Sequence, residues 1–171
     1  DIALSEADLV FETFRSLEFL DGHGDEAAAH PELVKQTLKD DIAWASGFDA
    51  ALIARAAGAR TRLFRRFQAL FEDYDLVLAP CVQVLPFPVE WEYPTEIDGV
   101  GMDKYYAWQR SCSRITATAM PSLAMPMTFS QEGLPIGVQF VGPCRGDRLL
   151  LEFGLTWEAA VADVIVRRPA L

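Results

Sequence analysis

The feature that most constrains this chain is the stretch 115–142, which holds two apolar runs separated by a polar break. In both runs, 122–129 and 135–141, apolar side chains recur at every second position. The residues that share a face are Leu123, Met125, Met127 and Phe129 in the first run, and Ile136, Val138 and Phe140 in the second. Period-two alternation with β-branched and aromatic residues is typical of strands. The stretch therefore predicts two consecutive β-strands.

The break between these strands predicts a hairpin connection. It spans residues 130–134, and Gly133 can supply the positive φ that a tight turn requires. Because nearly every position of both strands is apolar, we expect other elements to cover both faces of the hairpin. This pattern favours a central place in a layered α/β domain.

The same stretch resembles the C-terminal part of the amidase signature family. In that family a Thr-Gly-Leu-Pro-like turn enters a strand, and a Gly-Leu-Pro-x-Gly-x-Gln-x-x-Gly hairpin and a helix follow. The matching residues are Thr118, Ala119, Met120 and Pro121, then Gly133, Leu134, Pro135, Gly137, Gln139 and Gly142. The resemblance implies an α/β fold, the C-terminal part of the amidase signature fold, with helices packed on a mixed β-sheet. Ala119 stands where the family usually has Gly, and a turn with φ > 0 there would be strained.

The first 72 residues predict three helices. Residues 5–20 and about 31–42 show apolar positions at helical spacing, and the segment 21–24, with two glycines, is expected to separate them. A long helix over about 48–72 carries an apolar stripe and an arginine-rich side, which we interpret as a solvated face. The stripe consists of Leu52, Ala56, Ala59, Leu63, Phe67 and Leu70, and the arginines are Arg55, Arg60, Arg62, Arg65 and Arg66.

Residues 74–162 predict the order strand, loop, helix, hairpin and helix. Residues 74–80 read as a short buried strand that ends in proline, similar to the family's Tyr-Asp-x-Leu-Leu-x-Pro element. The loop 81–103 is long for a compact domain, and loops of this length are usually functional. A helix is expected over 102–118, and Asp147 is expected to cap the last one.

Length, charge and cysteine spacing limit the function classes. The 171 residues have the length of one domain, so 1–171 is interpreted as a single domain or as a fragment. The net charge of −10 argues against direct nucleic-acid binding, which needs excess Lys and Arg. No apolar run approaches the ~20 residues of a membrane span, so no membrane contact is expected. Three cysteines without a C-x-x-C motif indicate free thiols in the cytoplasm.

The family resemblance implies amide hydrolysis by a Ser nucleophile, a second Ser in a cis peptide and a Lys. A Ser hydroxyl needs an adjacent base, and the oxyanion needs N–H donors such as a Gly-rich loop presents. This chain has no such loop and no Ser-x-x-Lys spacing. Lys104 and Ser111 share an expected helix, but they lie ~10 Å apart along its axis. We therefore assign no catalytic residue, metal or cofactor here and expect the triad upstream.

Four residues are candidates for the wall of a substrate pocket: Cys81, Trp91, Tyr105 and Trp108. Cys81 follows a strand and begins the long loop, where pocket residues are often found. The family often has Thr at this position. As a nucleophile, Cys81 would need a His or a cationic partner, and none can be assigned. The aromatic residues are expected pocket walls, with core or lid packing as the alternative.

Three functions remain open. The leading hypothesis is the C-terminal segment of an amidase signature hydrolase, inactive by itself, that completes the fold and walls the pocket for a small-molecule carboxamide. The second is a stand-alone domain that binds a ligand or a partner without catalysis. The third is the amidotransferase branch of the same family, whose members are subunits that act on charged transfer RNA. A fragment would expose the edges of strands 76–79 and 123–129, which favours a homodimer or other association.

Overall fold

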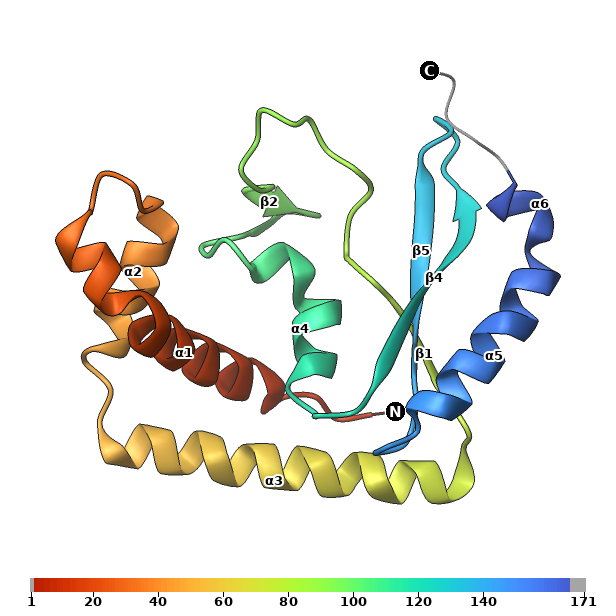
Figure 1. Ribbon diagram of the computed structural model, residues 1–171, viewed down its shortest axis with the longest axis horizontal. Helices are drawn as coiled ribbons and strands as arrows, with labels where there is room; N and C mark the ends of the chain where they lie inside the picture. Colours follow the sequence, from red (N-terminus) through yellow and green to blue (C-terminus); the bar gives the residue numbers. More distant parts are fainter. Residues whose placement is uncertain (1, 167–171) are drawn as a thin grey trace. The chain divides into compact units, whose positions relative to one another are not determined.

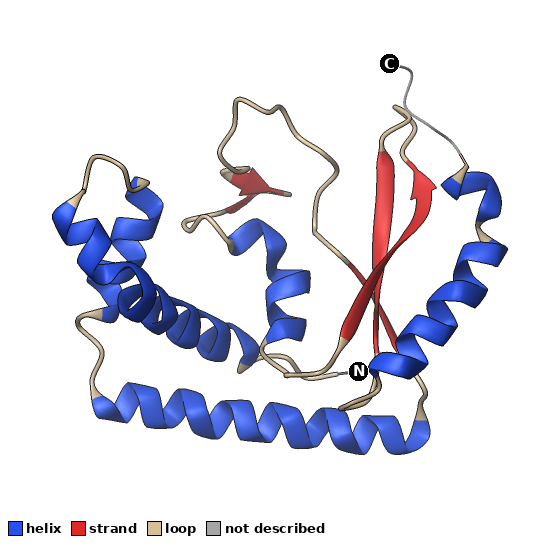
Figure 2. Ribbon diagram, in the orientation of Figure 1, coloured by secondary structure: helices blue, strands red, loops and turns tan. Residues whose placement is uncertain are grey.

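The computed structural model describes residues 2–166. The chain divides into two compact units, Asp1–Leu63 and Phe64–Leu171. The division falls inside helix α3 (Ala50–Asp73), which Figure 1 shows as one continuous helix. Figure 2 shows that helices make up the first unit, whereas the strands all belong to the second.

The first unit pairs helix α1 (Ala7–Ala29) with helix α2 (Gln36–Ala45). The buried side of α1 recurs at every third position: Ala7, Val10, Thr13 and Ser16. Small side chains at this spacing let a second helix approach closely. Between α1 and α2, the guanidinium of Arg15 donates a hydrogen bond to the carboxylate of Asp41, and both side chains are largely buried.

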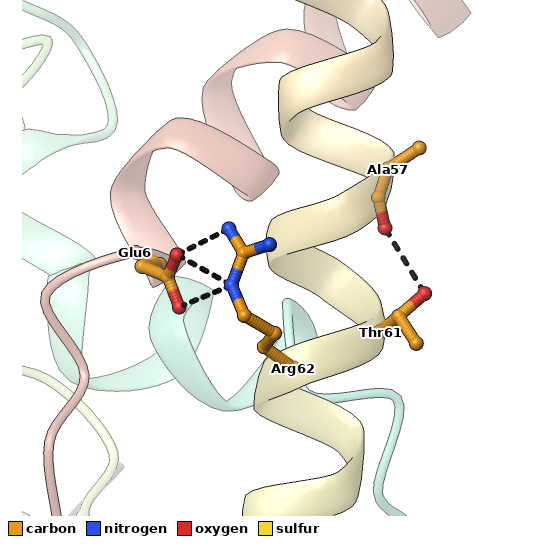
Figure 3. Close-up of polar contacts among 4 residues, drawn as sticks. All are labelled: Glu6, Ala57, Thr61 and Arg62. Atoms are coloured by element: carbon orange, nitrogen blue, oxygen red, sulfur yellow. Dashed lines mark hydrogen bonds and ion pairs between the residues drawn. The ribbon is translucent and has the colours of Figure 1, made fainter.

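Glu6, the residue that precedes α1, binds Arg62 on α3 (Figure 3). Nε of Arg62 donates to both carboxylate oxygens at 3.0 and 3.4 Å, and its Nη2 donates to Oε1 at 2.5 Å. This hydrogen bond raises the pKa of Arg62 above its usual value. A carboxylate at the start of a helix also interacts favourably with the helix dipole, although the Glu6 side chain makes no capping hydrogen bond to α1.

The expected break at residues 21–24 is wrong, because α1 continues through them to Ala29. Gly22 is exposed, and a side chain there would meet nothing within 4 Å, so no tertiary contact opposes the helical conformation. A glycine in a helix costs about 1 kcal/mol, which a long helix packed on a neighbour can offset. The second helix consequently starts at Gln36, later than expected, and Leu33 is exposed in the turn before it.

Helix α3 agrees closely with its expected range. The carboxylate of Asp49 accepts the backbone N–H of Leu52 at 2.7 Å and so caps the helix. Four residues of the predicted stripe are fully buried: Ala56, Ala59, Leu63 and Phe67. Four of the five arginines are exposed and Arg66 is half-buried, which confirms the solvated face.

The second unit is built on a three-stranded sheet in the order β1 (Val77–Pro80), β5 (Pro135–Val141), β4 (Ser122–Phe129). The predicted hairpin is confirmed with the same boundaries. Gly133 has φ 83°, and the N–H of Ser130 donates to the carbonyl of Leu134 at 2.8 Å. Both strand pairs are antiparallel. In residues 2–166 this sheet is antiparallel throughout, so the expected mixed sheet stays a prediction.

Helix α5 (Asp147–Ala160) covers one face of this sheet, and the short helix α6 (Ala162–Ile165) follows it (Figure 1). The core between α5 and the hairpin holds Met125, Val138, Phe140 and Leu150, flanked by Leu76, Leu123, Phe153 and Trp157. The indole N–H of Trp157 donates to the carbonyl of Pro126 at 2.8 Å, next to an irregularity in the β4 register. Gly146 occupies the N-cap position of α5, in place of the expected Asp147.

The other face of the sheet is covered only in part, by the 3₁₀ helix η1 (Ala107–Gln109) and helix α4 (Arg110–Thr116). Ala124 and Pro126 on this face are exposed. On β1, an edge strand, Leu78 is 56% exposed. The prediction that both faces of the hairpin are covered, and that residues 74–80 form a buried strand, is therefore wrong for the described chain.

The segment between β1 and α4 departs from the expected loop and helix. It contains a small hairpin, β2 (Glu96–Ile97) and β3 (Val100–Gly101), whose turn places Asp98 and Gly99 at φ 50° and 74°. The N–H of Met102 donates to the carbonyl of Thr95 at 2.8 Å. This bond extends the small hairpin, so helical structure begins only at Ala107 instead of at residue 102.

Candidate functional site

A cavity of about 420 Å³ lies where β1, β5 and the following loop meet. Its wall consists of Pro80, the loop residues 81–87, Trp108 of η1 and residues 135–137 at the start of β5. Its volume is within the range of small-molecule sites, which are mostly apolar and carry few polar groups. The cavity lies entirely within the second unit.

Cys81 is a half-buried residue of this cavity wall. Its carbonyl accepts the hydroxyl of Ser111 at 3.0 Å, which ties the strand end to α4. A Cβ built on Gly137 would lie 3.6 Å from the Cys81 sulfur, so the thiol packs on the glycine backbone. Burial, and next the neighbouring Cys112, raise the pKa of the Cys81 thiol. The group is therefore neutral near pH 7, which opposes a role as thiolate nucleophile.

Aromatic rings form the outer side of the cavity. Phe87 contacts Trp108 edge to face, with ring centroids 5.2 Å apart, and stacks on Trp91 at 6.4 Å. Trp91 is 54% exposed and supports the wall from outside. Tyr105 packs on Tyr93 instead, and it is not among the residues that line the cavity. The structure thus brings Cys81 and Trp108 together, while the binding role of all four candidates stays a prediction.

A second hollow, of about 330 Å³, shares Cys81 and Val82 with the first. It lies between α4 and the start of β4, and its wall includes Cys112 and the more polar Gln109, Thr116 and Ser122. Cys81 therefore lines both hollows.

Gln139 fixes the geometry of this region, although it was not a candidate from the sequence. Its side-chain amide donates to the carbonyls of Pro80 at 2.9 Å and Ser111 at 3.0 Å. Its oxygen accepts the hydroxyl of Ser122 at 3.1 Å. One buried amide thus links β1, α4, β4 and β5. The available signal was a glutamine within an apolar strand, because a buried amide must find hydrogen-bond partners.

The lining of the larger cavity contains no Lys, His, Asp or Glu. Lys104 lies over the ring of Tyr106 at 5.6 Å, and Lys39 donates to the carbonyl of Pro31 in the first unit. Among residues 2–166 no group of three His, Cys, Asp or Glu side chains is arranged to hold a metal ion. The cavity walls can therefore enclose a substrate, but a nucleophile and its base are not assembled on them.

Comparison with known proteins identifies the family. A family model described as Amidase matches residues 3–151, most of the chain. The chain belongs to the amidase signature family. Its structure also matches that of a bacterial aryl acylamidase of this family, with a TM-score of 0.79 at 17% identity, over 98% of this chain and 37% of the other. A further amidase structure matches with a TM-score of 0.81 at 20% identity, over 94% and 36%.

Curated relatives of this amidase chain include the A-type subunits of glutamyl-tRNA(Gln) amidotransferases. One of them, from Clostridium acetobutylicum, is 30% identical over 117 residues, 68% of this chain and 23% of the relative. Another, from a Synechococcus species, is 30% identical over 138 residues, which are 81% of this chain and 27% of the relative. The chain thus spans about a quarter of the length of these relatives. None of the helices in residues 2–166 is long and apolar enough to cross a membrane.

Proposed function

We propose that this chain is the C-terminal segment of an amidase signature hydrolase, in which it completes the fold and walls the substrate pocket. The observation that carries this proposal is a built cavity whose lining contains no base. A wall without its own nucleophile and base fits a segment that works with a Ser-cisSer-Lys triad supplied by another part of the protein. The share of each relative that the chain spans supports the same reading.

In the reaction that we propose, the upstream Ser attacks the carbonyl carbon of a carboxamide. The C–N bond then breaks, the amine leaves with a proton, and water releases the acyl group as a carboxylic acid. The role of the present chain is to hold the substrate and to exclude water, which raises the effective concentration of the reacting groups. No residue of the cavity wall takes part in proton transfer.

Isolation of the native protein from its source, through an affinity tag placed after this chain in the genome, tests the proposal. The expected polypeptide is several-fold longer than 171 residues and hydrolyses carboxamides. The separately expressed 171 residues should be inactive on the same substrates. A native polypeptide of the same length as this chain, without hydrolysis, would overturn the proposal and favour a stand-alone binding domain.

A second candidate is the amidotransferase branch of the family, and the names of the curated relatives favour it. In this case the native protein would release ammonia from an amide donor and pass it to a charged transfer RNA. The net charge of −10 implies that a different subunit would hold the RNA. Amide transfer to glutamyl-tRNA, measured beside simple hydrolysis, separates the two branches.

We also propose that the isolated chain associates through the free edge of β1, where Leu78 is 56% exposed. Open strand edges with apolar side chains template pairing with another chain. Light scattering should then show a mass above that of one chain, and a stable monomer at high concentration would contradict this.

The unpaired thiols of Cys81, Cys112 and Cys144 support a reducing compartment, the cytoplasm.

A further inference from the structure

We infer that the cavity beside Cys81 takes the uncharged, apolar end of an amide substrate, and that the absence of a side chain at Gly137, next to Cys81, leaves the space for it. This inference rests on the proposed function and names the substrate class of that site. It also favours the hydrolase over the glutamine-using branch, because glutamine carries an ammonium and a carboxylate.

The side chains of the wall determine which chemical groups can bind. Apart from the Cys81 thiol, no side chain on the wall is ionisable. The amide oxygen of Gln83 already accepts the backbone N–H of Arg110 at 2.8 Å, so this acceptor is engaged. A charged group that enters the cavity would find no counter-ion among the side chains of this wall. An apolar group would instead gain in proportion to the area that it removes from water.

The size and rigidity of the cavity determine how large a group it can hold. A cavity of roughly 150 Å³ lined by aliphatic and aromatic side chains holds benzene, so about 420 Å³ holds a ring with substituents. Pro80, Pro86 and Pro135 each fix a backbone angle of the wall. Phe87 and Trp108 brace each other edge to face. The hollow is therefore largely formed before a ligand arrives, which lowers the entropic cost of binding.

The space around Gly137 limits which side chains fit at this position of the wall. A Cβ on Gly137 would lie 3.4 Å from the carbonyl oxygen of Met125 and 3.6 Å from the Cys81 sulfur. These are ordinary contact distances, so alanine fits at this position without displacing its neighbours. Gly137 lines the cavity, so a larger side chain at this position takes up volume beside Cys81. Its size therefore changes the space that is open to a substrate.

Protection of Cys81 from alkylation tests the inference on the native protein from its source, with each probe in large excess so that turnover does not deplete it. The probes are phenylacetamide, phenylacetate with the same ring but a negative charge, and L-glutamine. The rate of Cys81 modification by N-ethylmaleimide is read by peptide mass spectrometry, and the exposed Cys144 serves as the internal control. We expect phenylacetamide alone to slow Cys81 severalfold, with Cys144 unchanged. Equal protection by glutamine, or none by phenylacetamide, would overturn the inference.

Two variants keep the test falsifiable, with binding measured by equilibrium dialysis. G137V should lose phenylacetamide binding, whereas G137A should keep it and reject a larger naphthyl analogue. If G137V does not fold, L85K supplies the test, because Leu85 lines the cavity and is 47% exposed. Its ammonium should reverse the preference toward phenylacetate. An unchanged preference in L85K would show that the probes bind elsewhere.

Because these experiments measure binding, their outcome does not depend on catalysis. Binding of phenylacetamide without any hydrolysis by the native protein would leave the cavity assignment standing and remove the hydrolase proposal. Hydrolysis by a native protein whose cavity prefers charged probes would leave the hydrolase proposal standing and remove the cavity assignment.

Discussion

The two units of this chain differ in their internal contacts. In the first unit, small buried side chains such as Ala7 and Ala59 are accompanied by ion pairs: Arg15 binds Asp41 between α1 and α2, and Glu6 binds Arg62. In the second unit an apolar core joins α5 to the sheet, with Phe140 in contact with Phe153 and Trp157 at centroid distances of 4.6 and 4.8 Å.

This difference explains why the cavity lies in the second unit. A cavity keeps its shape only where the surrounding side chains are close-packed and rigid. The second unit provides such walls, through prolines, paired aromatic rings and the buried amide of Gln139. Ion pairs near the surface contribute little and lose strength in salt. The two units should therefore respond differently to substitution, and the following changes measure by how much.

The largest effect is expected for Phe140→Ala in the apolar core. Phe140 is 4% exposed, and its removal leaves a cavity between α5 and the hairpin. We expect a loss of about 3–5 kcal/mol in the free energy of unfolding, measured by urea denaturation. Leu151→Ala on the exposed side of α5 is the matched control, and it should cost at most about 0.5 kcal/mol. Similar values for the two variants would contradict the core described here.

The next effect is expected for Asp41→Asn in the first unit. The change removes the charge that Arg15 binds, where the two side chains are 16% and 11% exposed. Hydrogen bonds to charged groups contribute about 1.5–3 kcal/mol, and a loss of this size should appear in urea denaturation. Glu6→Gln is the control, because the side chain of its partner Arg62 is 58% exposed. The control should cost less and respond more to salt, and the opposite order would refute the comparison.

Gln139→Leu should destabilise the second unit by about 1–3 kcal/mol, because it removes the buried amide that donates two part-buried hydrogen bonds, to the carbonyls of Pro80 and Ser111. It should also increase hydrogen exchange at the end of β1 and in α4, which the amide links. Ser122→Ala removes only the hydroxyl that donates to Gln139 and should have a smaller effect. Unchanged exchange in Gln139→Leu would mean that the amide does not organise this region.

Ala119→Gly is expected to stabilise the chain by about 1 kcal/mol. Ala119 follows α4 with φ 59°, a left-handed conformation that costs an L-residue about 1–2 kcal/mol and glycine almost nothing. The hydroxyl of Thr118 already holds the turn, since it donates to Ile115 and accepts the N–H of Met120. Thermal unfolding of the variant should show a higher Tm. A lower Tm would mean that the methyl group makes a contact that outweighs the strain.

The smallest effect concerns pH. The pKa of Cys81 is raised in the folded chain above its ordinary value of 9.0, first by burial and then by Cys112. The folded state therefore holds a proton that the unfolded state releases above pH ~9, so this contribution to stability is present below that pH and falls as pH rises. Between pH 8 and pH 10, wild type should lose slightly more Tm than Cys81→Ala. Parallel curves would contradict the shift.

Local patterns predicted some elements well. The hairpin was predicted to the residue, because period-two alternation and Gly133 act over a few positions. Helix α3 was likewise predicted from its apolar stripe. The glycines of α1 misled the prediction, since packing of a long helix overrides the cost of single residues. The hairpin of β2 and β3 was not predicted, although Asp98-Gly99 between two β-branched residues is a known hairpin signal.

The candidate site was less predictable, because a cavity depends on contacts between distant segments. Sequence position indicated Cys81, which ends a strand beside a long loop. Nothing in the spacing could show that Trp108 would reach the cavity while Tyr105 would turn to Tyr93. The role of Gly137 depends likewise on the sulfur of Cys81, which lies far from it in sequence and close to it in space.

The central claim is that the cavity beside Cys81 takes the apolar end of an amide substrate. Its most direct test is the ratio of kcat/KM for two amides in the native protein from its source. We expect phenylacetamide to be hydrolysed with a kcat/KM at least about tenfold above that of glutamine, and we expect G137V to reduce this ratio. A native protein that prefers glutamine, with a ratio that G137V does not change, would contradict it.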